Sequence, residues 1–291
     1  MADDIFIGVD GGATKSTVRI ENSAGHLLGQ GMGGPANIRL SIDKSWESIY
    51  QAVEEALKLS QLRLADKNYR FHLGLGLAGC EMPKTVEEFL SRPHPFTTIQ
   101  LTSDAHIACV GAHQGKDGAI IIVGTGIIGY AIEKKKTTRV GGWGFPHDDE
   151  GSGAWLGLEA VRLTFQWLDQ RIEKSPLVAD IFAFFNHDME RLITWANQAN
   201  STEFARLTPL VIHHLQQKEV TAVRLIKQAA HAVDRIGMTL IKMQQDPHHP
   251  LPCSLLGGVA PFVEPWLHDE LRYSLVPPQA DANKGAILMI R

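Results

Sequence analysis

The residues with the clearest chemical pattern lie near the N-terminus, in the stretch FIGVDGGATKSTVRI at residues 6–20. An apolar run ends at Asp10, two glycines follow, and Lys15 precedes a serine and a threonine. A glycine-rich turn can present backbone N–H groups to phosphate, because glycine permits close approach and positive φ. Asp10 would then face a metal ion held by that phosphate. The alternative is an ordinary hairpin with a surface lysine, since a single motif match has low specificity.

The residues after the lysine decide which kind of loop this is. A Walker A loop needs glycine directly before the lysine and a helix after it, whereas Thr14 precedes Lys15 here. The following residues, STVRIEN, alternate polar and apolar side chains and include β-branched types, which predicts a returning strand. The loop is therefore predicted to be the tip of a β-hairpin.

The elements that would position this loop occur twice in the chain. GAIIIVGTGIIGYAIE at 118–133 is again an apolar strand, a glycine-containing tip and an alternating strand. HLGLGLAG at 72–79 and CSLLGGVA at 253–260 form a second pair, each a short apolar strand that runs into a glycine-rich turn. Two halves built on one plan indicate an internal duplication.

Helices are predicted at 44–60 and over nearly all of 154–245. Toward the end of the second range, residues at three- and four-residue steps form a stripe along one helical face. This stripe is expected to lie in the core, and its members are Val223, Ile226, Ala230, Val233, Gly237 and Leu240. We expect an α/β protein with two similar domains and a cleft between them. The expected domains are 1–115 and 116–279, with 280–291 packing back on the first and the second half rich in helix.

A different glycine pattern, G-x-G-x-x-G at 74–79, raises the possibility of a dinucleotide-binding fold. That fold needs an acidic residue about twenty positions later, and the next strand supplies Asp104 too late. It also leaves both hairpins unexplained. We therefore disfavour it.

Composition limits the classes of function. The chain has 291 residues, 44% of them hydrophobic, and a formal net charge of −4, which gives no general attraction to nucleic acid or to an anionic membrane. The start MADDIF has no signal-peptide pattern, and no apolar run reaches transmembrane length, so a cytoplasmic protein is expected. Three cysteines without a CxxC pair predict reduced thiols. The lysine run at 134–136 is expected to be a solvated hairpin turn.

Six motifs carry a resemblance over essentially the whole chain. They are DGGATKS at 10–16, GPANI at 34–38, SDA at 103–105, GTG at 124–126, GGWGFPHDDEGSGAWLG at 141–157 and LLGGVA at 255–260. Together they resemble N-acetylglucosamine kinases and bacterial glucosamine kinases of the BadF/BadG/BcrA/BcrD-type ATPases. That group shares the duplicated, RNase H-like ATPase domains of the actin, hexokinase and Hsp70 superfamily.

The resemblance implies an ATP site and a role for each motif in it. The first hairpin would hold the β- and γ-phosphates through Gly11, Gly12, Ala13, Thr14 and Lys15. Thr125 and Gly126 would bind the phosphates from the second hairpin, and Gly257 and Gly258 would hold adenosine. Asp10 would organise Mg²⁺ through water, because Mg²⁺ loses its hydration shell reluctantly.

The resemblance also implies a sugar site. Asp104, in the SDA motif, would be the general base that takes the proton of the attacking hydroxyl. Asn37 and Asp149 would hydrogen-bond sugar hydroxyls, and the backbone at Gly142 would line the same pocket. Without the resemblance, Asp104 at a strand-to-helix junction is better interpreted as a helix cap.

The acidic run HDDE at 147–150 bears on the substrate. In the N-acetylglucosamine kinase pattern a glycine usually stands where this chain has Asp148. An additional carboxylate would favour a cationic free amine over an acetamide. Glucosamine is therefore the first expectation, to give glucosamine 6-phosphate, with N-acetylglucosamine as the alternative; a homodimer is compatible with either.

Other classes of function remain to be compared. An activator ATPase of the BadF type needs cysteines placed for an iron–sulfur cluster, and the three cysteines form no evident set. A non-catalytic sensor would be expected to lack Asp104 or the lysine loop, and both are present. His106, Cys109 and His113 fall on one helical face, but no fourth metal ligand is apparent.

Overall fold

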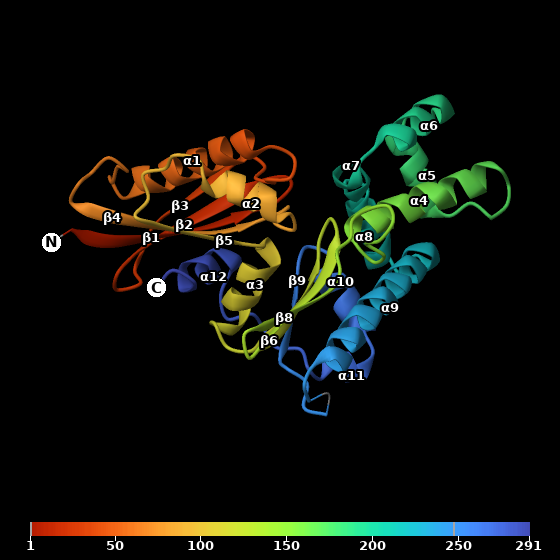
Figure 1. Cartoon of the computed structure of the whole chain (residues 1–291). Helices are drawn as coiled ribbons and strands as arrows, with labels where there is room; N and C mark the ends of the chain where they lie inside the picture. The colour runs from red at the N-terminus through yellow and green to blue at the C-terminus, as the bar shows by residue number, and fades with distance from the viewer. Residues whose placement is uncertain (1, 247) are drawn as a thin grey trace. The chain divides into compact units, whose positions relative to one another are not determined.

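The computed structural model describes residues 2–246 and 248–291, and it divides into two compact units (Figure 1). Unit 1 comprises the chain up to Gly118 together with Pro277–Arg291, and unit 2 comprises Ala119–Val276. The sequence had suggested 1–115 with 280–291 for the first domain and 116–279 for the second. Each unit is described by itself below.

Unit 1 is built on a five-stranded sheet with the order β3-β2-β1-β4-β5. Its strands are β1 (Asp3–Gly11), β2 (Ser16–Asn22), β3 (Leu27–Gly33), β4 (Tyr69–Leu77) and β5 (Thr98–Thr102). β1 is antiparallel to β2, which confirms the predicted first hairpin. β1, β4 and β5 are mutually parallel, so their carboxyl ends meet at one edge of the sheet.

Helices cover both faces of this sheet (Figure 1): α1 (Ile42–Leu59) and α2 (Pro83–Leu90) on one, α3 (Asp104–His113) and α12 (Ala282–Leu288) on the other. Gly74 explains why the G-x-G-x-x-G pattern does not mark a nucleotide loop. It lies inside β4, and a Cβ there would stand 2.2 Å from the Ala286 carbonyl oxygen of α12. The glycine therefore permits close packing of a helix on the strand.

Unit 2 repeats the plan with a four-stranded sheet in the order β8-β7-β6-β9. Its strands are β6 (Gly118–Val123), β7 (Ile127–Glu133), β8 (Lys136–Gly141) and β9 (Cys253–Leu256). The order matches β3-β2-β1-β4 of unit 1, so the predicted duplication is confirmed. Lys134 and Lys135 both have positive φ and form the turn between β7 and β8, as the lysine run predicted.

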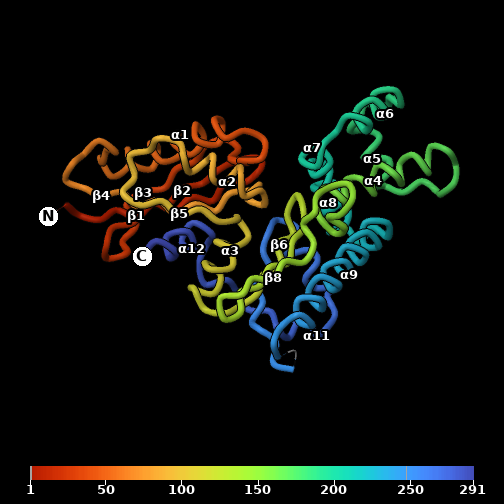
Figure 2. The backbone as a smooth tube through the Cα atoms, in the orientation of Figure 1, coloured from red at the N-terminus to blue at the C-terminus, as the bar shows by residue number. Residues whose placement is uncertain are grey.

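Helices make up most of the rest of unit 2, and Figure 2 traces their succession. They are α4 (Gly153–Leu168), α5 (Pro176–Phe184), α6 (Met189–Gln198), α7 (Ser201–Ala205), α8 (Thr208–Gln216), α9 (Val220–Met243), α10 (Ala260–Val263), η1 (Glu264–Trp266) and α11 (Asp269–Arg272). Side-chain caps at Ser175, Asp188 and Asn200 begin separate helices where the sequence predicted one nearly continuous stretch.

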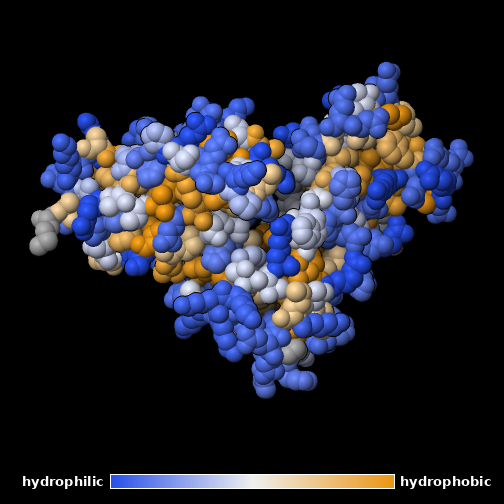
Figure 3. Space-filling model, in the orientation of Figure 1, coloured by the Kyte–Doolittle hydropathy of each residue, from blue (hydrophilic) through white to orange (hydrophobic). Residues whose placement is uncertain are grey.

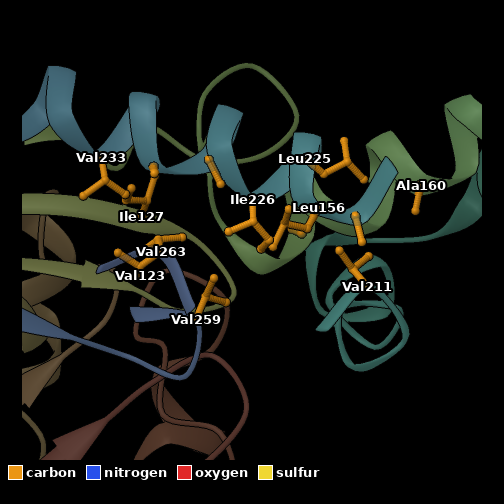
Figure 4. Packing of buried hydrophobic residues seen from close by; sticks show 14 of the residues in the cluster. Val123, Ile127, Leu156, Ala160, Val211, Leu225, Ile226, Val233, Val259 and Val263 are labelled. Atoms are coloured by element: carbon orange, nitrogen blue, oxygen red, sulfur yellow. The ribbon is translucent and has the colours of Figure 1, made fainter. Parts of the chain in front are cut away.

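The core of unit 2 lies between its sheet and its helices (Figure 4). Val123 and Ile127 of the sheet pack in one cluster with Ile226 and Val233 of α9. The predicted α9 stripe is buried except at Val223, which is half-buried. Among the described residues no helix has the length and apolar character needed to span a membrane. Figure 3 shows hydrophilic residues around the rim of the visible face and hydrophobic residues among them toward its middle.

Candidate active site

The tip of the first hairpin is a closed turn with an open outer side. The Gly12 N–H donates to the Lys15 carbonyl at 3.0 Å. A Cβ on Gly12 would meet nothing closer than that carbonyl oxygen, at 3.6 Å. Ala13, Thr14 and Lys15 are exposed. The turn therefore leaves room beside its backbone for a ligand, and it adds one cationic side chain.

The base of the same hairpin is rigidly packed. A Cβ on Gly11 would stand 2.4 Å from Leu77 Cδ2 and 2.9 Å from Ala36 Cβ. The Gly11 carbonyl accepts from Ala78 N–H at 2.8 Å, and the Gly12 carbonyl accepts from Ala36 N–H at 3.0 Å. These contacts fix the hairpin to the end of β4 and to the GPANI segment.

Three carboxylates influence one another electrostatically at this edge of unit 1. Burial, with the negative charges of Asp104 and Asp281, raises the pKa of Asp10 to about 6, and the nearby charge of Lys15 opposes the shift. Asp281, which sequence reasoning missed, caps α12 by accepting from Lys284 N–H at 2.8 Å. Its only local signal is an acidic residue before a short helix, and its position beside Asp10 depends on tertiary structure.

Asp104 is the first residue of α3 and not its cap. Ser103 is the cap, and its hydroxyl accepts from His106 N–H at 3.2 Å. The interpretation of Asp104 as the cap is therefore wrong, because the preceding serine fills that role. The Asp104 carboxylate accepts from Ala105 N–H at 2.8 Å. This carboxylate thus lies at the N-terminal end of α3, where the helix dipole is positive.

Asn37 lies beside the end of β4, at the edge where Asp10 and Asp104 also lie. Its backbone pairs with Ala78, and its Oδ1 accepts from Arg39 N–H at 3.1 Å. A Cβ on Gly79 would stand 2.5 Å from the Asn37 Oδ1 atom, so the two residues are in close contact. Unit 1 thus brings together the lysine hairpin, Asp10, Asn37 and Asp104.

The second hairpin tip is hydrogen-bonded to the start of α4. Gly124 N–H donates to the Gly126 carbonyl at 2.9 Å, which closes the turn. The carbonyls of Gly124 and Thr125 accept from Gly153 N–H at 2.8 Å and Ala154 N–H at 3.0 Å. Thr125 itself is exposed. The tip is therefore held in place while its side chain remains accessible.

The late glycine turn lies against the same hairpin. Gly257 has φ +99°, and a Cβ there would stand 2.4 Å from the Val123 carbonyl oxygen, so the position requires glycine. A Cβ on Gly258 would meet no atom within 4 Å. The chain thus passes close to the end of β6 at Gly257, and the space beside Gly258 is open.

A pocket of about 600 Å³ in unit 2 joins these two turns. Its lining includes Gly124, Thr125 and Gly258, which the sequence had singled out. Four further lining residues that sequence reasoning missed are Ile212, His213, Gln216 and Phe262. Apolar walls with a few polar groups are typical of a small-molecule site. Those four positions carry no motif: three lie in α8, which reads as an ordinary helix, and Phe262 lies in the short helix α10.

Asp148 and Asp149, predicted to bind sugar, both bond to the backbone. Asp148 Oδ2 accepts from Trp143 N–H at 2.9 Å. Asp149 is buried, and its Oδ1 accepts from Ile127 N–H at 3.0 Å. Burial raises the pKa of Asp149, opposed by the hydrogen bond from Ile127. Glu150, next in the acidic run, forms an ion pair with Arg235.

The structure gives no support for a metal site made of protein side chains alone. Within residues 2–246 and 248–291, no group of three or more His, Cys, Asp or Glu side chains is arranged to hold a metal ion. Cys109 and His113 are buried, and burial lowers the pKa of His106. Asp10, with one carboxylate near a phosphate-type hairpin, suits a Mg²⁺ ion whose other ligands are water and phosphate.

Comparisons with known proteins find similarity over most of the chain. A family model described as the BadF/BadG/BcrA/BcrD ATPase family matches residues 7–287. The glucosamine kinase GspK of Vibrio cholerae is 33% identical over 283 residues, which cover 97% of this chain and 94% of that protein. An N-acetylmuramic acid/N-acetylglucosamine kinase of Clostridium acetobutylicum is 27% identical, covering 98% of this chain and 97% of its own.

Solved structures agree with the family match. The crystal structure of a putative N-acetylglucosamine kinase from Chromobacterium violaceum has a TM-score of 0.91 and 34% identity, covering 99% of each chain. A glucokinase of the ROK family from Streptomyces griseus, with a TM-score of 0.57 and 14% identity, shares the fold. The predicted α/β fold of duplicated ATPase domains is confirmed, and the chain belongs to the BadF/BadG/BcrA/BcrD ATPase family.

Proposed function

We propose that this protein transfers the γ-phosphoryl group of ATP to the 6-hydroxyl of an amino sugar, with glucosamine as the first substrate. The observation that carries the proposal is the grouping at one edge of unit 1. There Ser103 caps α3, so Asp104 does not serve as the cap. Asp104 lies at the same sheet edge as Asp10 and the lysine hairpin. Phosphoryl transfer needs this combination of a base, a metal-organising carboxylate and a phosphate-binding loop.

The nucleotide roles follow from the two hairpins and the glycine turn. The hairpin from Gly11 to Lys15 binds the β- and γ-phosphates beside its open tip at Gly12, and the Lys15 ammonium neutralises their charge. Thr125 and Gly126 bind phosphate through the second hairpin. The pocket that contains Gly258 takes the adenosine, with Ile212 and Phe262 as its apolar walls. Mg²⁺ bound near Asp10 would neutralise charge as it develops on the phosphates.

The transfer step places the proton on Asp104. The sugar 6-hydroxyl attacks the γ-phosphorus, the bond from that phosphorus to the bridging oxygen of ADP breaks, and the hydroxyl proton moves to the Asp104 carboxylate. Asn37 and the Gly142 backbone orient the sugar. The products are ADP and a sugar 6-phosphate, and the protonated Asp104 returns its proton to water.

The choice of amino sugar rests more on relatives than on Asp148. The Vibrio cholerae relative is named a glucosamine kinase, and the Clostridium acetobutylicum relative is named for N-acetylated sugars. The Asp148 carboxylate accepts from Trp143 N–H, so it holds the loop whichever amine the sugar carries. Glucosamine stays the first candidate and N-acetylglucosamine the second. We place the reaction in the cytoplasm, and a homodimer stays a proposal.

An activator ATPase is disfavoured by the cysteines. Cys109 and Cys253 are buried. Burial, reinforced by the negative charge of Asp104, raises the pKa of Cys80 to about 12. The three cysteines contain no CxxC pair and two of them are buried, so they form no evident set of cluster ligands.

A substrate panel tests the proposed function. Purified protein is mixed with ATP, Mg²⁺ and, in turn, glucosamine, N-acetylglucosamine, glucose and mannose, and ADP release is measured. We expect the highest kcat/KM with glucosamine. Asp104→Asn should lower kcat by roughly 10² to 10⁴ and leave sugar affinity largely intact, because Asn keeps an acceptor for Ala105 N–H. Turnover by this variant within threefold of wild type would remove Asp104 from its role as base.

A further inference from the structure

The loop from Gly141 to Asp149 contains four residues in left-handed backbone conformations. Gly141, Gly142 and Gly144 have φ values of +70°, +74° and +102°, and Asp149 has φ +72°. Glycine loses more conformational freedom on ordering than any other residue. Ordering a loop with three such glycines therefore costs conformational entropy, which contacts to the loop must offset.

Arg139, near the end of β8, holds the start of the loop through hydrogen bonds and a ring contact. Its Nε donates to the Gly141 carbonyl at 3.1 Å, and its Nη2 donates to the Gly142 carbonyl. Its guanidinium carbon lies 4.7 Å from the centroid of the Trp143 ring. One half-buried side chain thus contacts three consecutive residues. A planar guanidinium can make all these contacts at once, and an ammonium cannot.

Two aspartates hold the other end of the loop by accepting hydrogen bonds from backbone N–H groups. Asp148 accepts from Trp143 N–H, which closes the loop onto itself. Asp149 accepts from Ile127 N–H, the first residue of β7 after the second hairpin tip. A Cβ on Gly126 would come within 3.0 Å of the Asp149 carboxylate, so the contact between loop and hairpin is tight. The loop is therefore fixed by Arg139 at one end and by the hairpin at the other.

We propose that Arg139 is a positioning residue for the sugar: it keeps the Gly141–Gly142 backbone in the conformation that binds the amino sugar. This inference rests on the proposed function, because it assigns the loop to the sugar. Arg139 needs no contact with substrate in this role. If the loop adopts its sugar-binding conformation only part of the time, the apparent affinity for the sugar is its intrinsic affinity multiplied by that fraction. The rate of the chemical step in the bound complex is unaffected.

Three variants test the role of Arg139 by steady-state kinetics. Arg139→Ala should raise KM for the amino sugar by roughly tenfold or more, with kcat at saturating sugar and KM for ATP within about threefold of wild type. Arg139→Lys keeps the positive charge but loses the planar guanidinium. Its KM for the amino sugar should therefore lie between the values for wild type and Arg139→Ala. Arg171→Ala, which removes an exposed ion pair with Asp169 in the same unit, is the matched control and should leave every constant unchanged.

Trp143 gives a second readout that does not need turnover. It is 78% exposed and stacks with Arg139. The Trp143 contribution, obtained by subtracting the emission of matched Trp143→Phe proteins, should change in wavelength and in quenching by acrylamide when Arg139 is replaced by Ala. The same subtraction in the Arg171→Ala background should show no change.

The outcomes separate this proposal from the proposed function. A folded Arg139→Ala protein with an unchanged sugar KM would overturn the positioning role alone. An equal rise in KM for sugar and ATP would also overturn it, since that pattern indicates general damage. If wild type phosphorylated no amino sugar, the proposed function would fail and this inference with it. If Arg139→Ala does not fold, Arg139→Lys decides between the same outcomes.

Discussion

The Asp10 carboxyl lies in an environment that favours its protonated form. Its pKa is raised to about 6 by burial and by Asp104 and Asp281, so the folded apo protein binds its proton more tightly than the unfolded chain does. A carboxyl with a raised pKa stabilises the fold below its unfolded pKa, and this stabilisation is lost as pH rises through the folded pKa. Asp10 thus contributes less to the free energy of unfolding at pH 7 than at pH 4. Such a loss of stability at neutral pH is consistent with a functional role.

Asp10→Asn tests this cost. Asn resembles the protonated form, so the apo variant should be more stable than wild type at pH 7, and the difference should shrink as pH falls from 6 to about 4. Urea unfolding of both proteins across that range measures the difference. Binding of Mg²⁺ with ATP should weaken in the same variant. A variant less stable than wild type by the same amount at every pH would contradict the pKa assignment.

The two hairpins are the elements that the sequence predicted best. β2 alternates buried and half-buried residues along STVRIEN, and this period-two pattern was visible in the sequence. β3 was missed because it contains glycine at alternate positions, which reads as a turn. In the structure Gly29 and Gly31 each lie under an α1 carbonyl, where a Cβ would come within 2.1 Å. The cause of that pattern is helix packing, which local sequence does not reveal.

The candidate site shows the same division between local and tertiary information. Asp104 and the hairpin tips stand out in sequence because their neighbours form motifs. Asp281 and the α8 residues His213 and Gln216 do not, because only folding brings them to the sheet edges. Asp148 was assigned to the sugar from its charge alone, and its bond to Trp143 N–H required coordinates.

Substitutions at the hairpin tips test their role in nucleotide binding. A Cβ on Gly12 has its nearest contact at 3.6 Å and one on Gly124 at 4.0 Å, so valine at either position should fold normally. We expect Gly12→Val and Gly124→Val each to weaken ATP binding at least tenfold by calorimetry, because the side chain occupies space for phosphate. Gly126 is less suitable, since a side chain there would crowd Asp149. Ala65→Val, in an exposed loop, is the control; unchanged ATP affinity in both hairpin variants would make the hairpins purely structural.

At the scale of the whole molecule, the C-terminal segment returns to unit 1 and is held there by a buried carboxylate. Glu21 is fully buried and accepts from Lys284 at 2.6 Å, Arg19 at 2.7 Å and Arg291 at 3.1 Å. Burial alone would raise the pKa of Glu21, but the bonds from Lys284 and Arg19 outweigh it and lower the pKa. Its stabilising effect is therefore present above the unfolded pKa and is lost as pH falls through the folded one.

Removing the carboxylate should cost more than removing one of its partners. Glu21→Ala leaves three cations without their shared anion, and we expect a loss of about 3–5 kcal/mol in the free energy of unfolding. Lys284→Ala leaves Glu21 with two partners and should cost about 1–3 kcal/mol. Arg162→Ala, which breaks an exposed pair with Glu159, should cost at most about 1 kcal/mol. Urea unfolding followed by a probe in unit 1 measures all three, and equal losses for Glu21→Ala and Lys284→Ala would contradict the network.

The fate of the γ-phosphate of ATP tests the central claim for the whole molecule. ADP release alone does not separate a kinase from an ATPase, so the reaction with glucosamine should be followed by phosphorus NMR. We predict one phosphomonoester on the 6-oxygen of the sugar for each ADP formed, with little inorganic phosphate. ADP accompanied by an equal amount of inorganic phosphate, and no sugar phosphate from glucosamine or N-acetylglucosamine, would contradict an amino-sugar kinase and indicate an ATPase instead.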